Sequence, residues 1–335
     1  MRYVVIGAGA VGGAIGGRLS QSGHDVVLIA RGAHHEALRR DGLRLVTPDG
    51  THRLPVPVAD RPEAVELRPD DVLVLAVKTQ DSVAALDAWA PRPVDGGGVA
   101  GDRLPLVCAQ NGVESERLAL RRFRQVYGMC VWLPSTHLEP GVVIAPCAPQ
   151  TGMLHLGRYP SGADKTDETA RQISADLEKS HFLAPVVPDV MRWKYAKLLS
   201  NIANAVEAVC GPDAGADAAA LVERAKAEGV AVLDAAGIAH TGAAEQSAAR
   251  AGKMDIQPLE GRARGGGSSW QSMVRGAGTI EADYLNGEIV LLGRLHGVPT
   301  PVNEALRRTA NECARERRAP GTITAARLTE IVDTP

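Results

Sequence analysis

The chain has 335 residues, and its 37 lysines and arginines nearly balance its 39 aspartates and glutamates, giving a formal net charge of −2. This length favours two domains over one compact core, and the balanced charge gives no sign of a nucleic-acid or membrane-surface partner. The five cysteines are widely spaced without a CxxC or Cys/His cluster, so we expect neither a metal site nor a disulfide framework. No apolar run approaches the length of a membrane span, and the chain opens directly on a strand, so the expected compartment is a reducing cytoplasm.

An apolar strand, a glycine-rich turn and a helix open the chain. The run Tyr3-Val4-Val5-Ile6 leads into the sequence GAGAVG at residues 7–12, and a second apolar run follows at residues 26–29. A GxGxxG motif between a strand and a helix is typical of a βαβ unit that binds a dinucleotide. A glycine-rich turn without a ligand is the alternative, and the strands on either side of the motif argue against it.

Each residue of this turn has an expected part in cofactor binding. Gly7 permits the sharp turn, Gly9 lets a pyrophosphate approach the backbone, and Gly12 lets the helix pack closely on the strand. Ala10 and Val11 complete the helix start, whose partial positive charge favours phosphate groups. We therefore expect these five residues to contact the dinucleotide.

The end of the second strand indicates which dinucleotide binds. Sites for NAD place an acidic residue there to bind the ribose hydroxyls, whereas this chain has Ala30 and Arg31. A guanidinium can grip the 2′-phosphate of NADP, which a carboxylate would repel. The pattern favours NADPH over NADH, with an ordinary solvated surface cation as the alternative interpretation of Arg31.

Two further predicted strands end in polar residues. Residues 72–77 form a continuous apolar run that ends at Lys78, and residues 104–109 form another that is followed by Gln110 and Asn111. Runs of this kind fit the central parallel strands of a doubly wound sheet, whose carboxyl edge binds ligands. Lys78 and Asn111 are thus expected at one crevice, and a solvated side chain at a strand end is the alternative for each.

The pattern changes near residues 183–189, where Pro185 and Pro188 interrupt the chain. Before this point, short apolar runs between residues 126 and 157 alternate with turn signals and are expected to finish the sheet. After it, the sequence is mainly helical in pattern. We therefore expect a dinucleotide-binding α/β domain over residues 1–187 and an all-helical domain over residues 188–335.

Four polar residues share one face of the first predicted helix of the second domain. Between Arg192 and Asn204, the residues Lys194, Lys197, Asn201 and Asn204 follow one another at intervals of three and four. Because the rest of the segment is largely apolar, this stripe would be buried and would need partners. A lysine beside two amides suits binding and protonating an oxyanion, whereas a solvated helix face is the alternative.

A second polar group lies further along the chain. Residues 265–269, which end in Ser268 and Ser269, precede a segment that carries Glu281 near the start of a predicted helix. The helix dipole favours an ionised Glu281 there, and an exposed glutamate that merely stabilises the helix start is the alternative. His296, just before a glycine, is expected as a cation at the helix end rather than as a catalytic base.

Taken in order, these motifs resemble the ketopantoate reductase family. The landmarks are GAGAVG at residues 7–12, Ala30-Arg31, Val77-Lys78, Gln110-Asn111-Gly112, Lys197-Leu198-Leu199 with Asn201, Ser268-Ser269, and Glu281 to Gly287. They span nearly the whole chain, which makes them far more specific than the glycine motif alone. The resemblance implies a Rossmann-type domain joined to a helical domain, with the active site in the cleft between them. It also implies NADPH-dependent reduction of 2-dehydropantoate to pantoate.

The resemblance also implies roles for individual residues. Lys197 would be the general acid that protonates the carbonyl oxygen, and Glu281 would orient that lysine or hold a substrate hydroxyl. Asn201 and Ser269 would bind substrate oxygens, and Asn111 would lie near both nicotinamide and substrate. Arg31 and Lys78 would serve the phosphate end of the cofactor.

One departure from the family pattern leaves the substrate open. The family helix commonly has a second asparagine four residues after the first, followed by proline, whereas Asn204 follows Asn201 by three. A change of one residue in helical spacing rotates a side chain by about 100°, so the substrate contact of that second asparagine would be lost or rebuilt at Asn204. Residues 241–267 also look like a variable, partly flexible segment beside the expected cleft.

Three functions therefore remain open. The first is reduction of ketopantoate, the second is reduction of another 2-keto acid or ketone, as by the D-2-hydroxy acid dehydrogenases of the family, and the third is a non-catalytic NADPH sensor. The expected partner is a small 2-keto acid. The sequence leaves the oligomeric state open, and a homodimer is one candidate.

Overall fold

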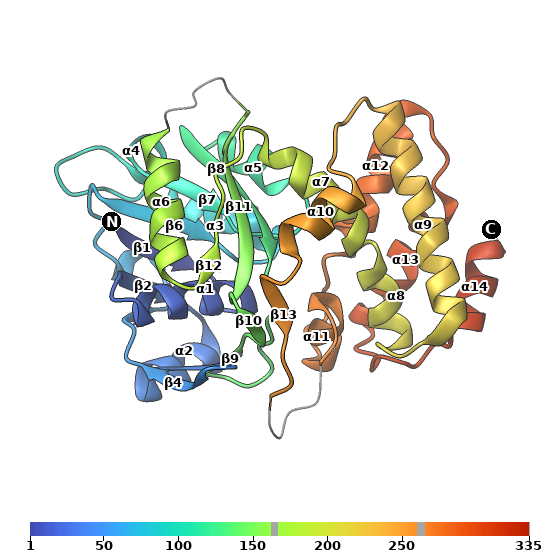
Figure 1. Ribbon diagram of the computed structural model, residues 1–335, viewed down its shortest axis with the longest axis horizontal. Helices are drawn as coiled ribbons and strands as arrows, with labels where there is room; N and C mark the ends of the chain where they lie inside the picture. Colours follow the sequence, from blue (N-terminus) through green and yellow to red (C-terminus); the bar gives the residue numbers. More distant parts are fainter. Residues whose placement is uncertain (162–166, 260–264, 335) are drawn as a thin grey trace. The chain divides into compact units, whose positions relative to one another are not determined.

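A computed structural model of the chain describes residues 1–161, 167–259 and 265–334 (Figure 1). Contacts between residues divide the chain into two compact units. Unit 1 comprises Met1–Gln110, Glu114–Trp193 and Ala243–Arg262, and unit 2 comprises Asn111–Val113, Lys194–Gly242 and Ala263–Pro335. The domain boundary between residues 187 and 188 stays a prediction.

The main sheet of unit 1 has eight strands within the described residues. Its order is β12 (Phe182–Leu183), β11 (Gly152–Tyr159), β8 (Gln125–Trp132), β7 (Pro105–Cys108), β6 (Asp71–Leu75), β1 (Arg2–Ile6), β2 (Asp25–Ile29) and β5 (Val58–Ala59). Neighbours from β5 to β8 are parallel, and β11 is antiparallel to β8. In the register of the central strands, Val5 lies opposite Leu28 on one side and Val74 on the other. The strand order reverses at β1, and such a switch point is where open α/β sheets bind ligands.

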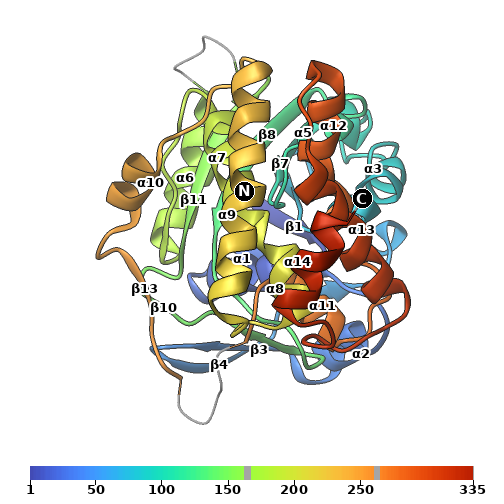
Figure 2. The ribbon, with the colours of Figure 1, turned by 90° about the vertical axis from the view of Figure 1, so that its right-hand side faces the viewer.

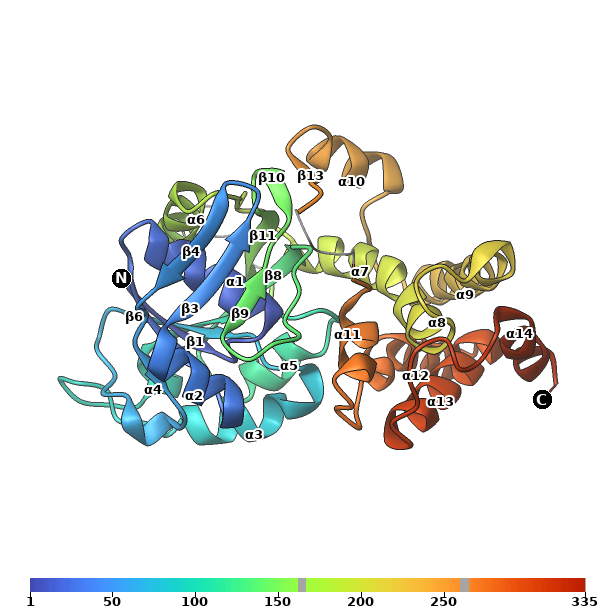
Figure 3. The same cartoon turned by 90° about the horizontal axis from the view of Figure 1, so that it is seen from below.

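Helices cover both faces of this sheet because successive side chains of a strand point to opposite faces. Tyr3 and Val5 pack in one core with α1 (Ala10–Gln21) and α6 (Glu168–Lys179), whereas Val4 and Ile6 pack in a second core with α3 (Ser82–Trp89), α4 (Ala100–Arg103) and α5 (Ser115–Leu120). Figure 3 shows α6 on one side of the sheet and α3, α4 and α5 on the other. The doubly wound sheet predicted from the sequence is confirmed.

Smaller elements complete unit 1. The segment after β2 forms α2 (Gly32–Asp41), and a three-stranded sheet contains β4 (Gly50–Leu54), β3 (Leu43–Thr47) and β9 (Val142–Ile144). The short 3-10 turns are η1 (Pro62–Ala64) and η2 (Thr79–Asp81). The strand β10 (Cys147–Pro149) pairs with β13 (Met254–Ile256).

The expectation that the apolar runs of residues 126–157 all finish the main sheet was only partly right. It holds for β8 and β11, whereas β9 and β10 belong to the small sheets. The physical reason is the turn before β9, where Gly141 has a φ of 79° and its carbonyl accepts a hydrogen bond from the Arg44 backbone N–H at 2.9 Å. This contact directs β9 to β3.

The described part of residues 241–267 contains a helix and a strand. These are α10 (Ala243–Arg250) and β13, both in unit 1. The Arg250 guanidinium lies 3.7 Å from the centre of the Trp132 ring, and Glu245 pairs with Arg192 at 2.7 Å. These contacts, together with pairing to β10, give the segment its structure, although residues 260–264 lie outside the described part of the chain.

Unit 2 is helical, as expected. Its helices are α7 (Val190–Asn201), which begins in unit 1, α8 (Ala203–Cys210), α9 (Gly215–Ala235), α11 (Ser268–Val274), α12 (Asn286–His296), α13 (Pro301–Arg315) and α14 (Ala325–Asp333), with the 3-10 turn η3 (Ala282–Tyr284). Figure 2 looks onto α9, α12, α13 and α14. In the described part of the chain, no helix has both the length and the apolarity that a membrane crossing requires.

Candidate functional site

The turn between β1 and α1 can be built only with glycine at two positions. Gly7 has a φ of +104°, and a Cβ on it would lie 2.8 Å from the Val77 backbone nitrogen. A Cβ on Gly12 would overlap the Gly7 carbonyl oxygen and come within 2.9 Å of the Ala76 side chain. The turn is therefore packed directly against the carboxyl end of β6, at the switch point of the sheet.

Gly9 differs from these two glycines because nothing lies within 4 Å of the position a Cβ would occupy. It is the N-cap of α1, which has no side-chain cap and no acidic residue in its first turn. The first N–H groups of a helix have no acceptor inside the helix, so this open space adjoins N–H donors at a positive helix end. Such a place fits the pyrophosphate of a dinucleotide.

Lys78 lies at the end of the segment that follows β6, where it is the N-cap of η2. Gln110, at the end of β7, donates hydrogen bonds from Nε2 to the Val77 carbonyl at 2.7 Å and to Ser82 Oγ at 2.8 Å. The side-chain amide of Gln80 is buried, and within the described residues neither its nitrogen nor its oxygen has a hydrogen-bond partner. Because an unsatisfied buried polar group costs about 1–3 kcal/mol, Gln80 fits a place that a polar ligand completes.

Gln80 and Gln110 are not among the site residues that the sequence pattern predicts. The available signal was their position, since both follow an apolar strand at the carboxyl edge of the sheet.

Arg31 is exposed and is the N-cap of α2, directly after the buried Ala30. The first turn of α2 contains no acidic residue. A free helix start beside a guanidinium is a favourable place for an anion. This geometry is compatible with the predicted contact to a 2′-phosphate.

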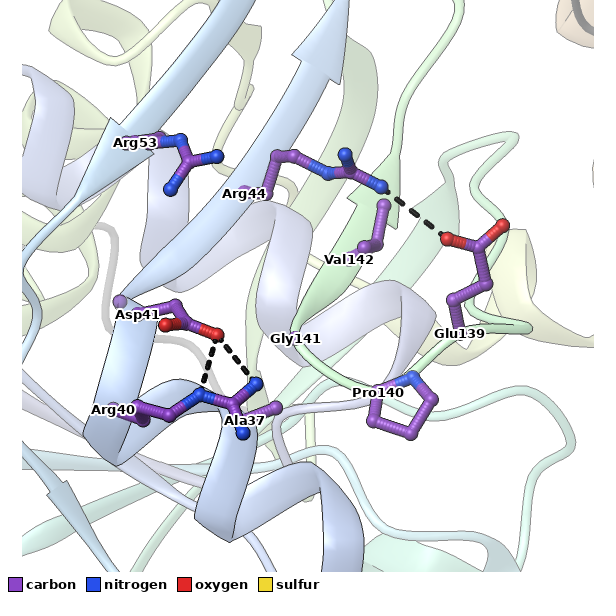
Figure 4. A pocket seen from close by; sticks show the side chains of 10 residues that line it. Ala37, Arg40, Asp41, Arg44, Arg53, Glu139, Pro140, Gly141 and Val142 are labelled. Atoms are coloured by element: carbon purple, nitrogen blue, oxygen red, sulfur yellow. Dashed lines mark hydrogen bonds and ion pairs between the residues drawn. The ribbon is translucent and has the colours of Figure 1, made fainter.

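A separate charged pocket lies at the opposite end of α2. Figure 4 shows that its polar lining comes from Arg40, Asp41, Arg44, Arg53 and Glu139. Arg40 pairs with Asp41 at 2.7 Å and Arg44 pairs with Glu139 at 3.2 Å. A helix of ten residues is about 15 Å long, so this pocket lies apart from the start of α2 that carries the expected cofactor contact.

In unit 2, the predicted stripe of four polar residues lies on two helices rather than one. The helix ends at Asn201, a turn at Ile202 follows, and α8 begins at Ala203, so Asn204 belongs to a different helix from Lys194 and Lys197. Lys194 is 3% exposed, and Lys197 and Asn201 are half-buried. The prediction of a continuous helix over residues 192–204 was wrong, while burial of the stripe is confirmed for Lys194.

Asn204 nevertheless lies beside another predicted site residue. A Cβ on Gly267 would lie 3.5 Å from Asn204 Oδ1, and Gly267 is the N-cap of α11, whose second residue is Ser269. Ser269 is 3% exposed. The structure thus brings Asn204 to the helix start that carries Ser269.

Glu207 also belongs to this arrangement, and the sequence alone did not select it. Its two carboxylate oxygens each accept a hydrogen bond from the Gly267 backbone N–H at 3.0 Å. A carboxylate at a helix N-terminus is stabilising, so Glu207 fixes the start of α11 against α8. Two buried polar atoms near these helices, Asn201 Oδ1 and Ser268 Oγ, have no hydrogen-bond partner within the described residues.

Glu281 is buried, with 6% of its surface exposed, and is the N-cap of η3. The helix α12 begins only at Asn286, so the alternative of an exposed glutamate at a helix start was wrong. Burying a carboxylate is costly unless it is paired. By contrast, His296 is exposed at the end of α12 before Gly297, as expected for a residue at a helix end.

Asn111 belongs to the same unit as Glu281. The adjoining Gly112 has a φ of +78°, and a Cβ on it would lie 3.0 Å from the Tyr284 carbonyl oxygen. The loop of Asn111 therefore packs on the turn that Glu281 begins. The described geometry thus gathers two sets of residues, the phosphate-binding features of unit 1 and the polar side chains of unit 2.

Comparisons with known proteins agree with this architecture. Residues 3–160 match the family model described as ketopantoate reductase PanE/ApbA, and residues 189–313 match the model for the C terminal of that family. A 2-dehydropantoate 2-reductase of Halobacterium salinarum is 30% identical over 91% of this chain and 96% of its own length. One from Mesorhizobium japonicum is 28% identical over 95% of this chain and 99% of its own length.

Solved structures give the same result for the fold. A PanE/ApbA family ketopantoate reductase from Ralstonia eutropha has a TM-score of 0.75 and 26% identity, covering 95% of this chain and all of that one. A D-mandelate dehydrogenase in complex with NADH and anilino(oxo)acetate has a TM-score of 0.77 and 20% identity over the same shares of the two chains.

The fold and these matches define an NAD(P)-dependent oxidoreductase that acts on CH–OH donors. The chain belongs to the ketopantoate reductase family, which confirms the resemblance seen in its motifs.

Proposed function

We propose that the enzyme reduces a 2-keto acid to a 2-hydroxy acid with NADPH, and that its substrate is 2-dehydropantoate. The observation that carries this proposal is the polar set of unit 2, which contains Lys197 and Asn201 on α7 and the buried Glu281. Relatives that carry the name 2-dehydropantoate 2-reductase match nearly the whole chain. A sensor without catalysis has no need for a proton donor among buried polar groups.

The assignment of the cofactor rests on unit 1. Gly7, Gly9, Ala10, Val11 and Gly12 would hold the pyrophosphate through the start of α1. Support comes from the open space at Gly9 and from the buried amide of Gln80 that has no partner within the described residues.

Further contacts would distinguish the two ends of the cofactor. Arg31 at the start of α2 would bind the 2′-phosphate, and Lys78 would serve the phosphate end. Asn111 follows β7 in the chain, and β7 ends at the sheet edge where the cofactor is expected. It would bind near the nicotinamide and the substrate.

The substrate contacts are assigned to unit 2. Asn201, Asn204 and Ser269 would bind the carboxylate and hydroxyl oxygens of the keto acid. The contact between Gly267 and Asn204 supports a joint role for Asn204 and Ser269. The two buried polar atoms without partners in the described residues, Asn201 Oδ1 and Ser268 Oγ, support a polar ligand there.

The reaction needs one hydride and one proton. NADPH, held at the start of α1 and by Arg31, would supply the hydride for C2 of the keto acid. Lys197 would donate a proton to the carbonyl oxygen as negative charge develops on it, and its ammonium group would stabilise that charge. Glu281 would orient Lys197 or accept a hydrogen bond from a substrate hydroxyl. Water then returns a proton to Lys197 after the hydroxy acid leaves.

The test is a comparison of substrates with the purified enzyme. NADPH oxidation is followed with 2-ketopantoate, 2-ketoisovalerate, benzoylformate and pyruvate, and the series is repeated with NADH. The proposal predicts a kcat/KM for ketopantoate above about 10⁴ M⁻¹s⁻¹ with NADPH, well ahead of the other acids. Tight NADPH binding without turnover of ketopantoate would overturn the substrate assignment.

A second candidate is reduction of a 2-keto acid with a different side chain. Two observations favour it, namely the fold shared with a D-mandelate dehydrogenase and the placement of Asn204 on a helix separate from Asn201. Benzoylformate, which has an aromatic side chain, is the member of the substrate series that tests this alternative. A higher kcat/KM for benzoylformate than for ketopantoate would establish it.

A further inference from the structure

His34 bridges two backbone segments of unit 1 that are far apart in sequence. Its Nε2 lies 2.8 Å from the Ala8 carbonyl oxygen, inside the glycine-rich turn. Its Nδ1 accepts a hydrogen bond from the Gly141 backbone N–H at 2.9 Å. The ring also lies against the ring of His137, with centres 4.1 Å apart. His34 is on α2, three residues after Arg31.

The two hydrogen bonds are compatible with only one protonation state of the imidazole. Gly141 can only donate through its N–H, so Nδ1 must carry a lone pair, and the Ala8 carbonyl can only accept, so Nε2 must carry the hydrogen. His34 is therefore neutral in this arrangement. Burial of the ring, opposed by its bond to the Ala8 carbonyl, lowers its pKa and so favours the same form.

The bond to Ala8 also fixes the orientation of the next N–H group. A peptide unit is planar and trans, so the carbonyl of Ala8 and the N–H of Gly9 point in opposite directions. The N–H groups of Gly7 and Ala8 are bonded to the Ile29 carbonyl, at 3.1 and 2.9 Å. Within the described residues the Gly9 N–H has no acceptor, and it adjoins the open space at Gly9.

We propose that His34 is a positioning residue of the cofactor site, which holds the Ala8 carbonyl so that the Gly9 N–H faces the pyrophosphate of the dinucleotide. The Gly141 N–H keeps the ring in the required form and orientation. This inference rests on the proposed binding of a dinucleotide at the glycine-rich turn. It differs from the role of Arg31, because the pyrophosphate is common to NADPH and NADH whereas the 2′-phosphate is not.

Two substitutions test the two hydrogen bonds of His34 one at a time. The amide nitrogen of glutamine can occupy the place of Nε2, so His34→Gln retains a donor to Ala8. The amide oxygen of asparagine can occupy the place of Nδ1, so His34→Asn retains an acceptor for Gly141 and loses the donor to Ala8. His34→Phe keeps the ring and loses both bonds. His35→Gln, at the next position on the helix, is the matched control.

The dissociation constants of NADPH and NADH and the melting temperature are measured for each variant. We expect His34→Asn and His34→Phe to weaken both cofactors by a similar factor, roughly 10- to 100-fold, because a misdirected N–H loses a hydrogen bond to a charged group. His34→Gln should stay within about fivefold of the wild type. At saturating cofactor kcat should change little, since His34 is not placed among the reacting groups.

Each contrary result has a distinct meaning. If the wild type binds neither dinucleotide, the proposed function fails and this inference fails with it. If the wild type binds NADPH and the asparagine and phenylalanine variants bind it equally well, only the role of His34 is overturned. A purely structural role would lower the melting temperature and the affinity together in all three variants, without recovery in His34→Gln.

A measurement on the unaltered protein covers the case in which the variants do not fold. The ring ¹⁵N chemical shifts of His34 distinguish the neutral form with hydrogen on Nε2 from the other neutral form and from the charged form. The proposal requires hydrogen on Nε2 and not on Nδ1 at neutral pH. Either other form would overturn it.

Discussion

The Asn286 side chain donates a hydrogen bond to the Ile202 backbone carbonyl at 3.2 Å, across 84 residues of sequence. Asn286 is completely buried, and it also donates to Asn303 Oδ1 at 3.0 Å. This contact ties α12 to Ile202, at the junction where α7 ends and α8 begins.

The lysine on α7 gives the most direct test of the chemistry. Lys197→Ala should lower kcat by roughly a hundredfold or more, because a positioned proton donor typically contributes about 10²–10⁴ in rate. The affinity for NADPH should stay nearly unchanged, since Lys197 is not among the residues assigned to the cofactor. Steady-state kinetics and a fluorescence titration of NADPH provide the two measurements.

The matched variant is Lys194→Met, at the buried lysine one turn earlier. Methionine keeps an apolar stem of similar length and removes the charge. If this variant loses turnover while Lys197→Ala keeps it, the proton donor is Lys194.

Arg31 determines cofactor preference if it binds the 2′-phosphate. Arg31→Ala should raise the Kd of NADPH by about 10- to 100-fold, the loss expected for a hydrogen bond to a charged group, and should affect NADH far less. Arg40→Ala is the control, because Arg40 is exposed on the last turn of the same helix and pairs with Asp41. Equal losses for both cofactors in Arg31→Ala would argue against phosphate recognition.

Substitutions of Gly9 and Gly12 should have different effects, the first on cofactor binding and the second on stability. Gly9→Ala should fold normally, because no atom lies within 4 Å of the new Cβ and the φ of −69° suits alanine. It should nevertheless weaken dinucleotide binding by roughly tenfold or more, about 1.4 kcal/mol, since the methyl group enters the space assigned to the pyrophosphate.

Gly12→Ala is the counterpart, because its Cβ would overlap the Gly7 carbonyl oxygen. It should lower the free energy of unfolding by about 1–3 kcal/mol, as measured by urea denaturation. Normal binding in Gly9→Ala would contradict the assignment of the open space to the cofactor.

His155 should make the stability of unit 1 depend on pH. The ring is 2% exposed and stacks on Trp193 with centres 3.8 Å apart. Burial, assisted by the nearby Arg250 charge, lowers its pKa from 6.5 to about 4. Between these pH values the unfolded chain binds more protons, so stability falls as pH decreases from 6.5 to about 4, by about 3 kcal/mol in total.

His155→Phe keeps a ring against Trp193 and removes the titrating group. The difference in unfolding free energy between wild type and variant should therefore change across this pH range and be constant above pH 6.5. His296→Gln, at an exposed helix end, serves as the control. Parallel pH profiles for wild type and His155→Phe would show that His155 does not cause the loss.

Local patterns of the sequence determined the doubly wound sheet, the glycine-rich turn and the helical second half. Strand alternation and runs of apolar residues are properties of neighbouring positions, and a glycine such as Gly7 is required by its own backbone angle of +104°. The order of landmarks such as Lys78, Lys197 and Glu281 also lies in the sequence, and the family follows from it. None of these inferences depends on which distant residues meet.

The tertiary structure decided the arrangement of the polar groups. The Asn286 side chain contacts Ile202 at the junction of α7 and α8, Glu281 is buried in the turn that precedes α12, and Asn204 lies beside Gly267. The bridge from Ala8 through His34 to Gly141 joins segments more than a hundred residues apart. Helical spacing cannot predict such contacts, because they are set by packing between elements, and packing determines which buried polar group finds which partner.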